Sequence, residues 1–233
     1  MPKRHNKRAY PLRLEPKLIP KVWGGSRLSQ IFNQPFSGPI GEAWLASTHP
    51  SAVSLIMNGP LRGHSIMDAL EIWGIPKDSF FSLLIKIIES REPLSVQVHP
   101  NDTFARQLEN QAQGKSEAWL ILESEQGHVG LGFESLPLFP DLESAKPEEI
   151  INPIRKINVN SGDWLLVPGR EIHFIGAGLM LLEVQQSSDV TYRIYDWNRS
   201  GRELHLHKAN QIIQRNPSQK EDIFFPSPRK PDW

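Results

Sequence analysis

The chain has 233 residues, with 26 basic and 26 acidic side chains and therefore a formal net charge of zero. Balanced charge provides no strong electrostatic attraction to nucleic acid or an anionic membrane, and we expect neither as a partner. Cysteine is absent, which excludes disulfides and thiolate metal sites, so a bound metal must use histidine, carboxylate or amide ligands.

The N-terminal segment, residues 1–16, is basic and has no apolar stretch behind its charges, so it does not read as a secretory signal. We interpret its start as a solvated tail, with weak binding of a polyanion as the alternative. No apolar run approaches the roughly 18 to 20 residues that a membrane span needs. We therefore expect a soluble, cytoplasmic protein.

The first predicted element is a helix at residues 65–73, where four apolar side chains recur at helical spacing. Strands follow at 81–88 and 94–99, because these runs are short and rich in Val, Ile, Leu and Phe. A second helix is expected from Asp102, as its N-terminal cap, to residue 113, with Gly114 closing it.

The second half of the chain continues with predicted strands at 117–122, 129–133, 163–167 and 179–185, and then a third helix from about 203 to 215. Strands dominate and helices lie between or after them, which favours an antiparallel sandwich or barrel over a doubly wound sheet. We divide the chain into a single domain over residues 1–216 and a proline-rich C-terminal tail over 217–233, whose prolines resist regular structure.

The strand at 94–99 carries the first candidate site. Side chains alternate between the two faces of a strand, so Ser95, Gln97 and His99 share one face and the apolar residues share the other. An amide and an imidazole on a common face suit the inside of a barrel, although a solvent-facing polar side is the alternative for this strand taken alone.

Two later segments supply further ligand candidates. Glu117 opens the next predicted strand, and a strand, a Pro-Gly turn at 168–169 and then His173 have nearly the spacing of the second cupin motif. In that motif the turn delivers a histidine into a barrel that already holds ligands from an earlier strand. Together with Gln97 and His99, these residues offer two imidazoles, one carboxylate and one amide, which suits zinc and also admits manganese, iron, cobalt or nickel.

A polar series interrupts an aromatic and β-branched run at residues 181–199. Glu183 and Gln185 share one face of the predicted strand, and Asp189 and Arg193 follow. Buried arginine and carboxylates are costly unless they pair with each other or a ligand or metal supplies the partner. We therefore regard these residues as part of a binding site, with a structural Asp189–Arg193 ion pair as the alternative.

Several blocks resemble the type I phosphomannose isomerase family, in the family's order, over roughly residues 12–215. They are KVWGG at 21–25, GEAW at 41–44, SVQVHPND at 95–102, GKSEAWLIL at 114–122, IHFIGAG at 172–178, QQSSDVTYRIYDWNR at 185–199 and GRELHLHKA at 201–209. The resemblance implies a mainly β fold, a cupin (double-stranded β-helix or jelly-roll) barrel with a few short helices.

The resemblance also implies an activity and a cofactor. The activity is the interconversion of mannose 6-phosphate and fructose 6-phosphate through an enediol, with one zinc ion per chain. The positions that match the family's metal ligands are Gln97, His99, Glu117 and His173.

Further site residues are carried over in the same way. Arg193 matches an arginine regarded as catalytic, and Lys115, Glu183 and a metal-bound hydroxide are all candidates for the group that takes the C2 proton. The resemblance places further residues near the substrate, and these are Lys86, Ser95 and Asp189. Lys86 and Lys115 are also candidates for binding the phosphate.

The sequence departs from the family pattern in two places. Arg170 and Glu171 stand where the family commonly has Gly and Thr, which puts two bulky charges at the lip of the ligand turn. Family members usually continue into a second β-domain, which has no counterpart after the last matching block. We expect part of the substrate enclosure to be missing or supplied by the tail or by a second subunit, as in a homodimer.

Two alternatives to an isomerase remain open from the sequence. One is a non-catalytic, regulatory protein that binds a sugar phosphate, although the retention of Arg193, Lys86 and Lys115 argues against lost chemistry. The other is a different metal-dependent cupin enzyme, such as an iron dioxygenase.

Overall fold

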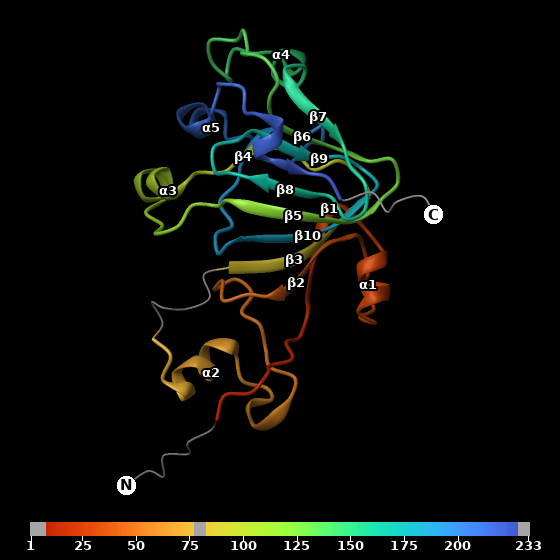
Figure 1. Ribbon diagram of the computed structural model, residues 1–233, viewed down its shortest axis with the longest axis vertical. Coiled ribbons are helices and arrows are strands. Elements are labelled where there is room, and N and C mark those ends of the chain that lie inside the picture. Colours follow the sequence, from red (N-terminus) through yellow and green to blue (C-terminus); the bar gives the residue numbers. More distant parts are fainter. Residues whose placement is uncertain (1–7, 77–82, 228–233) are drawn as a thin grey trace.

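The computed structural model describes residues 8–76 and 83–227, which form two antiparallel β-sheets packed face to face (Figure 1). The larger sheet has seven strands, in the order β1 (Lys17–Gly25), β2 (Ile40–Ala46), β3 (Leu83–Ser90), β10 (Leu179–Gln186), β5 (Glu117–Ser124), β8 (Trp164–Val167) and β12 (Phe224–Phe225). The smaller has five, in the order β11 (Tyr192–Tyr195), β4 (Val96–Val98), β9 (His173–Ile175), β6 (His128–Phe133) and β7 (Ile154–Asn158). The mainly β, antiparallel prediction is confirmed.

All six predicted strands are present, each shifted by at most two residues at either end. The start of the strand predicted at 81–88 lies outside the described residues. Strands β1, β2, β7, β9, β11 and β12 were not predicted. For two of them the reason is local. Strand β9 has only three residues, and β1 contains Pro20 and a glycine pair that interrupt its alternation of apolar and polar residues.

Short helices lie at the ends and outer surfaces of the sheets: α1 (Arg27–Ile31), α2 (Ile66–Trp73), α3 (Asp102–Glu109), α4 (Pro147–Ile151) and α5 (Leu206–Ile212), with 3₁₀ turns η1 (Gly59–Leu61) and η3 (Lys220–Asp222). Helix α2 matches its prediction. In Figure 1 it forms, with the N-terminal segment, a lobe beneath β2 and β3. None of the helices in the described part of the chain is long and apolar enough to cross a membrane.

The second and third predicted helices are shorter than expected. The N-cap of α3 is Asn101, whose side chain accepts a hydrogen bond from the Phe104 N–H at 3.1 Å, and Asp102 is the first helical residue. Asn110, in a left-handed conformation, ends the helix well before Gly114. Helix α5 ends at Ile212, because the next residue has an extended ψ of 130°.

The core that supports the site lies between the two sheets. Alternate residues of β5 and β8 point inward, among them Trp119, Ile121 and Leu165, and they pack against Val129 and Leu131 of the opposite sheet. The strand alternation predicted for residues 94–99 is confirmed, since Val96 and Val98 belong to a second apolar cluster on the outer side of the smaller sheet. Their polar neighbours therefore point into the barrel.

The C-terminal segment joins the larger sheet. Phe224 and Phe225 form β12, which pairs with β8 so that Phe224 lies opposite Leu165 and Phe225 opposite Trp164. Phe224 packs against the barrel core, whereas Phe225 points outward. The division of the chain at residue 216 stays a prediction, and residues beyond 227 lie outside the described part.

Candidate metal centre and active site

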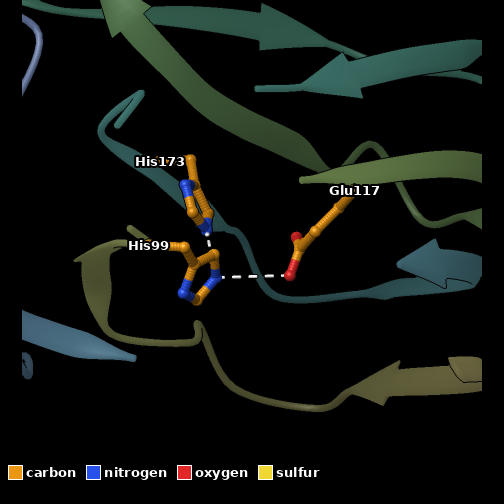
Figure 2. Close-up of side chains that lie close together, drawn as sticks. All are labelled: His99, Glu117 and His173. Atoms are coloured by element: carbon orange, nitrogen blue, oxygen red, sulfur yellow. Dashed lines mark hydrogen bonds and ion pairs between the residues drawn. The ribbon is translucent and has the colours of Figure 1, made fainter. Parts of the chain in front are cut away.

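Two histidines and a glutamate meet inside the barrel (Figure 2). His99 follows β4, Glu117 begins β5 and His173 begins β9, so both sheets contribute. Gln97 lies directly opposite His173 in the pairing of β4 with β9. One nitrogen or oxygen atom from each of the three residues lies within 4.8 Å of the others, and all three residues are buried.

The protonation of the two imidazoles follows from their hydrogen bonds. His99 Nδ1 lies 2.9 Å from the Val190 carbonyl oxygen, and His173 Nδ1 lies 2.9 Å from the Glu171 carbonyl oxygen. A carbonyl oxygen only accepts, so each Nδ1 carries the proton and each Nε2 of a neutral ring carries a lone pair. The two Nε2 atoms face each other at 3.2 Å, where neither has a proton to donate.

The surroundings of the cluster keep both imidazoles neutral and the carboxyl group ionised. Burial, reinforced by the Lys115 charge, lowers the pKa of His99 to about 3, and burial also lowers the pKa of His173, so both rings are neutral at neutral pH. Burial opposes ionisation of Glu117, but the Lys115 charge and the interactions with His99 and His173 together outweigh it and hold the pKa of that carboxyl well below its usual range. The cluster therefore presents one carboxylate and two imidazole lone pairs at neutral pH.

A cation is what this donor set needs. Glu117 Oε1 is buried, lies 3.2 Å from His99 Nε2 and accepts no well-formed hydrogen bond. The Lys115 ammonium stands beside these ligands, 2.7 Å from Glu117 Oε1 and 3.1 Å from His99 Nε2, and it supplies positive charge. Converging imidazole and carboxylate atoms around a buried point fit a divalent metal ion, so the residues present suit the metal that the sequence predicts.

Gln97 borders the same cluster with its amide. Its Nε2 lies 3.2 Å from His173 Nε2, and Ser95 Oγ donates to its Oε1 at 3.2 Å. The amide nitrogen donates to the imidazole lone pair here, and a half-turn of the amide plane would bring the oxygen to the cluster instead. Gln97 is thus placed to complete the donor set.

A cavity of about 260 Å³ opens beside the cluster. Its wall includes Gln97 and every residue that the sequence analysis placed near the substrate or in proton transfer: Lys86, Ser95, Lys115, Glu183, Asp189 and Arg193. The structure therefore brings all of the predicted site residues together, with His99, Glu117 and His173 as the buried cluster next to the cavity. Their individual roles stay predictions.

Alternating charges line one side of the cavity, and we call Lys21, Glu42, Lys86 and Glu183 the charge chain. Lys21 Nζ lies 3.2 Å from Glu42, Glu42 lies 3.8 Å from Lys86 Nζ, and Lys86 Nζ lies 2.9 Å from Glu183. Strand pairing explains the order, because Glu183 lies opposite Lys86 in the register of β10 with β3. Glu42 and Lys21 were missed by the sequence reasoning, although a lone acid in the apolar strand IGEAWLA was a usable signal.

Burial and neighbours shift the charges of this chain in opposite directions. Burial disfavours the ionised form of Glu42, yet Lys86 and Lys21 lower its pKa to about 2. Burial likewise disfavours the Lys86 cation, but Glu183 and Glu42 together raise its pKa above the usual range. For Glu183, burial and the nearby Glu117 charge win over Lys86 and raise the pKa.

Trp119 links the charge chain to the metal-ligand cluster. Its indole Nε1–H lies 2.9 Å from Glu183 Oε2 and 3.1 Å from Glu117 Oε2, so it is shared between the two carboxylates. The indole is fully buried, which fixes the separation of these two acids. Two carboxyl groups that share one hydrogen-bond donor therefore have pKa values shifted in opposite directions, raised for Glu183 and lowered for Glu117.

The alternative interpretation of Asp189 and Arg193 as an ion pair is wrong. Arg193 Nη1 donates to the Glu203 carbonyl at 2.6 Å, and its buried Nε has no hydrogen-bond partner. The Asp189 carboxylate, whose side chain is 55% exposed, lies 3.6 Å from His49 Nε2. Arg202 also lines the cavity and donates to both carboxylate oxygens of Asp196, at 2.9 and 3.0 Å.

The two charged residues in the ligand turn point away from the cavity, contrary to expectation. Arg170, at a φ of 80°, directs Nε to the Ile212 carbonyl at 2.8 Å and lies over the Phe104 ring. Glu171 accepts a hydrogen bond from Ser218 Oγ at 2.6 Å. The left-handed backbone at Arg170 turns both side chains toward α5 and the C-terminal segment.

Comparison with known proteins gives one consistent family. A family model described as phosphomannose isomerase type I, catalytic domain, matches residues 12–119. A Streptococcus mutans protein named mannose-6-phosphate isomerase is 37% identical over 213 residues, covering 88% of this chain and 67% of that protein. A Bacillus subtilis protein named as a probable mannose-6-phosphate isomerase is 35% identical over 215 residues, covering 88% and 68%.

Solved structures agree with the sequence relatives. The crystal structure of the mannose 6-phosphate isomerase from Bacillus subtilis superposes with a TM-score of 0.76 at 30% identity, covering 88% of this chain and 69% of that chain. This match confirms the predicted cupin-type barrel.

Proposed function

Because the chain belongs to the type I phosphomannose isomerase family, we propose that it interconverts mannose 6-phosphate and fructose 6-phosphate. The observation that carries the proposal is the cavity of about 260 Å³, which joins an electron-rich His–Glu–His cluster to a buried chain of lysines and glutamates. Isomerisation moves a proton between C2 and C1 of the open-chain sugar through an enediol. It therefore needs a proton carrier and fixed positive charge near both oxygens.

His99, Glu117 and His173 would hold a single zinc ion, with Gln97 as the fourth protein ligand. The support is the pair of opposed Nε2 lone pairs, the buried carboxylate beside them and the absence of cysteine from the sequence. When bound, zinc would supply Lewis-acid polarisation of the substrate carbonyl and stabilise the charge of the enediolate.

Glu183 is the residue that we propose as the base for the C2 proton. It lines the cavity, and burial together with Glu117 raises the pKa of its carboxyl toward the range where a general base works best near neutral pH. Lys86 and Trp119 hold one oxygen each, at 2.9 Å, so the carboxylate has a defined orientation. Lys115, beside the metal ligands, is placed to donate a hydrogen bond to the substrate oxygens.

Arg193 is proposed to hold negative charge that develops on the sugar oxygens. Its buried Nε–H has no partner within the described residues, so a ligand in the cavity would satisfy it. Lys86 is held by two carboxylates and is nearly inaccessible, so we assign it to orienting Glu183 and to sugar hydroxyls rather than to the phosphate. Ser95 and Asp189 would contact hydroxyls, and the partly exposed Arg202 would contact the phosphate.

A coupled isomerase assay on mannose 6-phosphate tests this function. Zinc-loaded protein should turn the substrate over, and Arg193→Ala should lower kcat by about 100- to 1000-fold, the usual effect of removing one electrostatic contributor. Arg106→Ala, on the exposed side of α3, is the matched control and should leave kcat unchanged. Normal metal binding with no turnover of any hexose 6-phosphate would instead identify a non-catalytic sugar-phosphate-binding protein.

A further inference from the structure

The outward side of the seven-stranded sheet carries two uninterrupted rows of apolar side chains. Residues that point away from the barrel interior alternate with the buried core residues along each strand. Strand register places them side by side across neighbouring strands. One row is Ile87, Leu182, Leu120, Trp164 and Phe225, and the other is Ile85, Val184, Ala118 and Leu166, and we call these nine residues the apolar outer face.

Little of the described chain covers this face. Helix α1 packs near one corner, where Leu28 and Phe32 lie in a cluster with Ile87. Three of the larger side chains remain strongly accessible, with Trp164 43%, Leu166 44% and Phe225 44% exposed. In Figure 1, helices α1, α2 and α3 lie beside strands β8, β5, β10 and β3 and do not cross them.

The smaller sheet shows what a covered face looks like in the same molecule. Its outward residues Val96 and Val98 are fully buried in a cluster with Ile150 of α4 and with Ala209 and Ile212 of α5. An antiparallel sheet that faces water normally alternates apolar residues inside with polar residues outside. The apolar outer face breaks that rule, which indicates that another protein surface covers it in solution.

We propose that the apolar outer face is the interface of a homodimer, in which it packs against the same face of a second copy of this chain. A two-fold interface brings each surface against itself, so like charges in the patch would meet, and neither row contains a charged residue. Two sheets packed face to face, about 10 Å apart, are a common arrangement in β-proteins.

The rim of the face also fits a dimer, and its area sets the expected strength. The Arg27–Glu123 ion pair at one end offers both signs of charge, and Ser116 and Gln186 lie at the other end, giving a polar border around an apolar centre. At the spacing and rise of β-strands, the nine residues of the apolar outer face cover roughly 300 Å² per copy. Two copies would bury roughly 600 Å² through these residues, below the size of stable interfaces, so we expect a weak, reversible dimer.

Sedimentation velocity across a range of protein concentrations tests the proposal. The full chain should shift from its mass of 26.5 kDa toward twice that value as concentration rises. Leu166→Glu places a charge on one of the most exposed side chains of the face, which points away from the barrel core, and should weaken dimerisation at least tenfold. Leu138→Glu, at a 97% exposed position outside the face, is the matched control and should not change it.

A second measurement protects the test against a variant that fails to fold. The chain contains no cysteine, so Leu166→Cys carries a single nitroxide label without further changes. Dipolar coupling between two labels at high concentration supports the proposal. A protein that remains a monomer at all concentrations, a dimer that Leu166→Glu leaves intact, or a dimer whose labels show no coupling overturns it.

Discussion

The metal-ligand cluster and the charge chain border the same cavity, yet they balance charge in opposite ways. In the charge chain, Glu42, Lys86 and Glu183 each lie within 4 Å of an opposite charge. Their charges are therefore balanced within the fold, without a ligand. In the cluster, lone pairs of His99 and His173 face each other beside the Glu117 carboxylate, and only the Lys115 ammonium stands against them.

This difference indicates that the metal-ligand cluster is arranged to bind a cation, whereas the charge chain is arranged to orient a catalytic carboxylate. A converging set of acceptors is costly inside a protein unless a cation joins it, so the cluster favours metal binding. A self-neutralised chain gains nothing from an added ion, but it fixes the position and the pKa of the carboxylate that faces the substrate. Variants in the two regions should therefore fail in different ways.

Removing a metal ligand should give the largest effect. His99→Ala deletes one of the opposed imidazoles, and we expect loss of stoichiometric zinc and a drop in kcat well beyond the 10- to 100-fold that partners of metal ligands typically contribute. Elemental analysis of the purified protein and the coupled assay report the two quantities. His207→Ala, whose side chain is 83% exposed, is the control, and equal zinc contents in both variants would refute the assignment of the cluster.

Neutralising the middle of the charge chain should preserve the metal but slow the reaction. Glu42→Gln keeps the shape of the side chain and leaves Lys86 with Glu183 as its remaining carboxylate partner, so Lys86 should bind Glu183 more strongly and weaken it as a base. We expect kcat to fall about 10- to 100-fold with an unchanged zinc content, which is less than the roughly 100- to 10,000-fold that general-base catalysis contributes, because the base is weakened and not removed. Glu123→Gln, on an exposed ion pair, serves as the control. Loss of zinc from Glu42→Gln would show that the two regions are not separable.

The charge chain should also leave a signature in acid stability. The Glu42 pKa is about 2 in the folded protein against an ordinary value of 4.5, so its contribution is present above pH 4.5 and disappears as pH falls toward 2. The shift corresponds to about 3 kcal/mol of unfolding free energy. Denaturant titrations of metal-free wild type and Glu42→Gln should show a stability difference that shrinks over this pH range. A difference that stays constant with pH would mean that Glu42 is not held ionised by Lys86 and Lys21.

The smallest effect is expected at the ligand turn. Glu171 lies two residues before His173, but its carboxylate accepts a hydrogen bond from Ser218 and points away from the cavity. Although Glu171 is buried, its carboxylate lines neither the cavity nor the metal-ligand cluster, so Glu171→Gln should change kcat/KM by less than about twofold. Steady-state kinetics under saturating zinc measure it, and a tenfold loss would place this side chain in the active site after all.

Strand alternation and the family resemblance together identified most of the site from the sequence. Ser95, Gln97 and His99 were assigned to one face because the strand period is two, and the structure places them inside the barrel. Glu42 was not predicted as a site residue, because only the pairing of β2 with β3 brings it to Lys86. The register between strands that are distant in sequence cannot be predicted from the local residue pattern. The direction of Arg170 depended on a left-handed φ that a non-glycine residue seldom adopts.

A zinc titration of metal-stripped protein tests the central claim most directly, with bound zinc and mannose 6-phosphate turnover followed in the same samples. The account predicts that turnover is absent without metal, rises in proportion to bound zinc and stops rising at one ion per chain. Turnover that is undiminished in the metal-free protein, or full zinc occupancy of His99, Glu117 and His173 with no turnover, would contradict it.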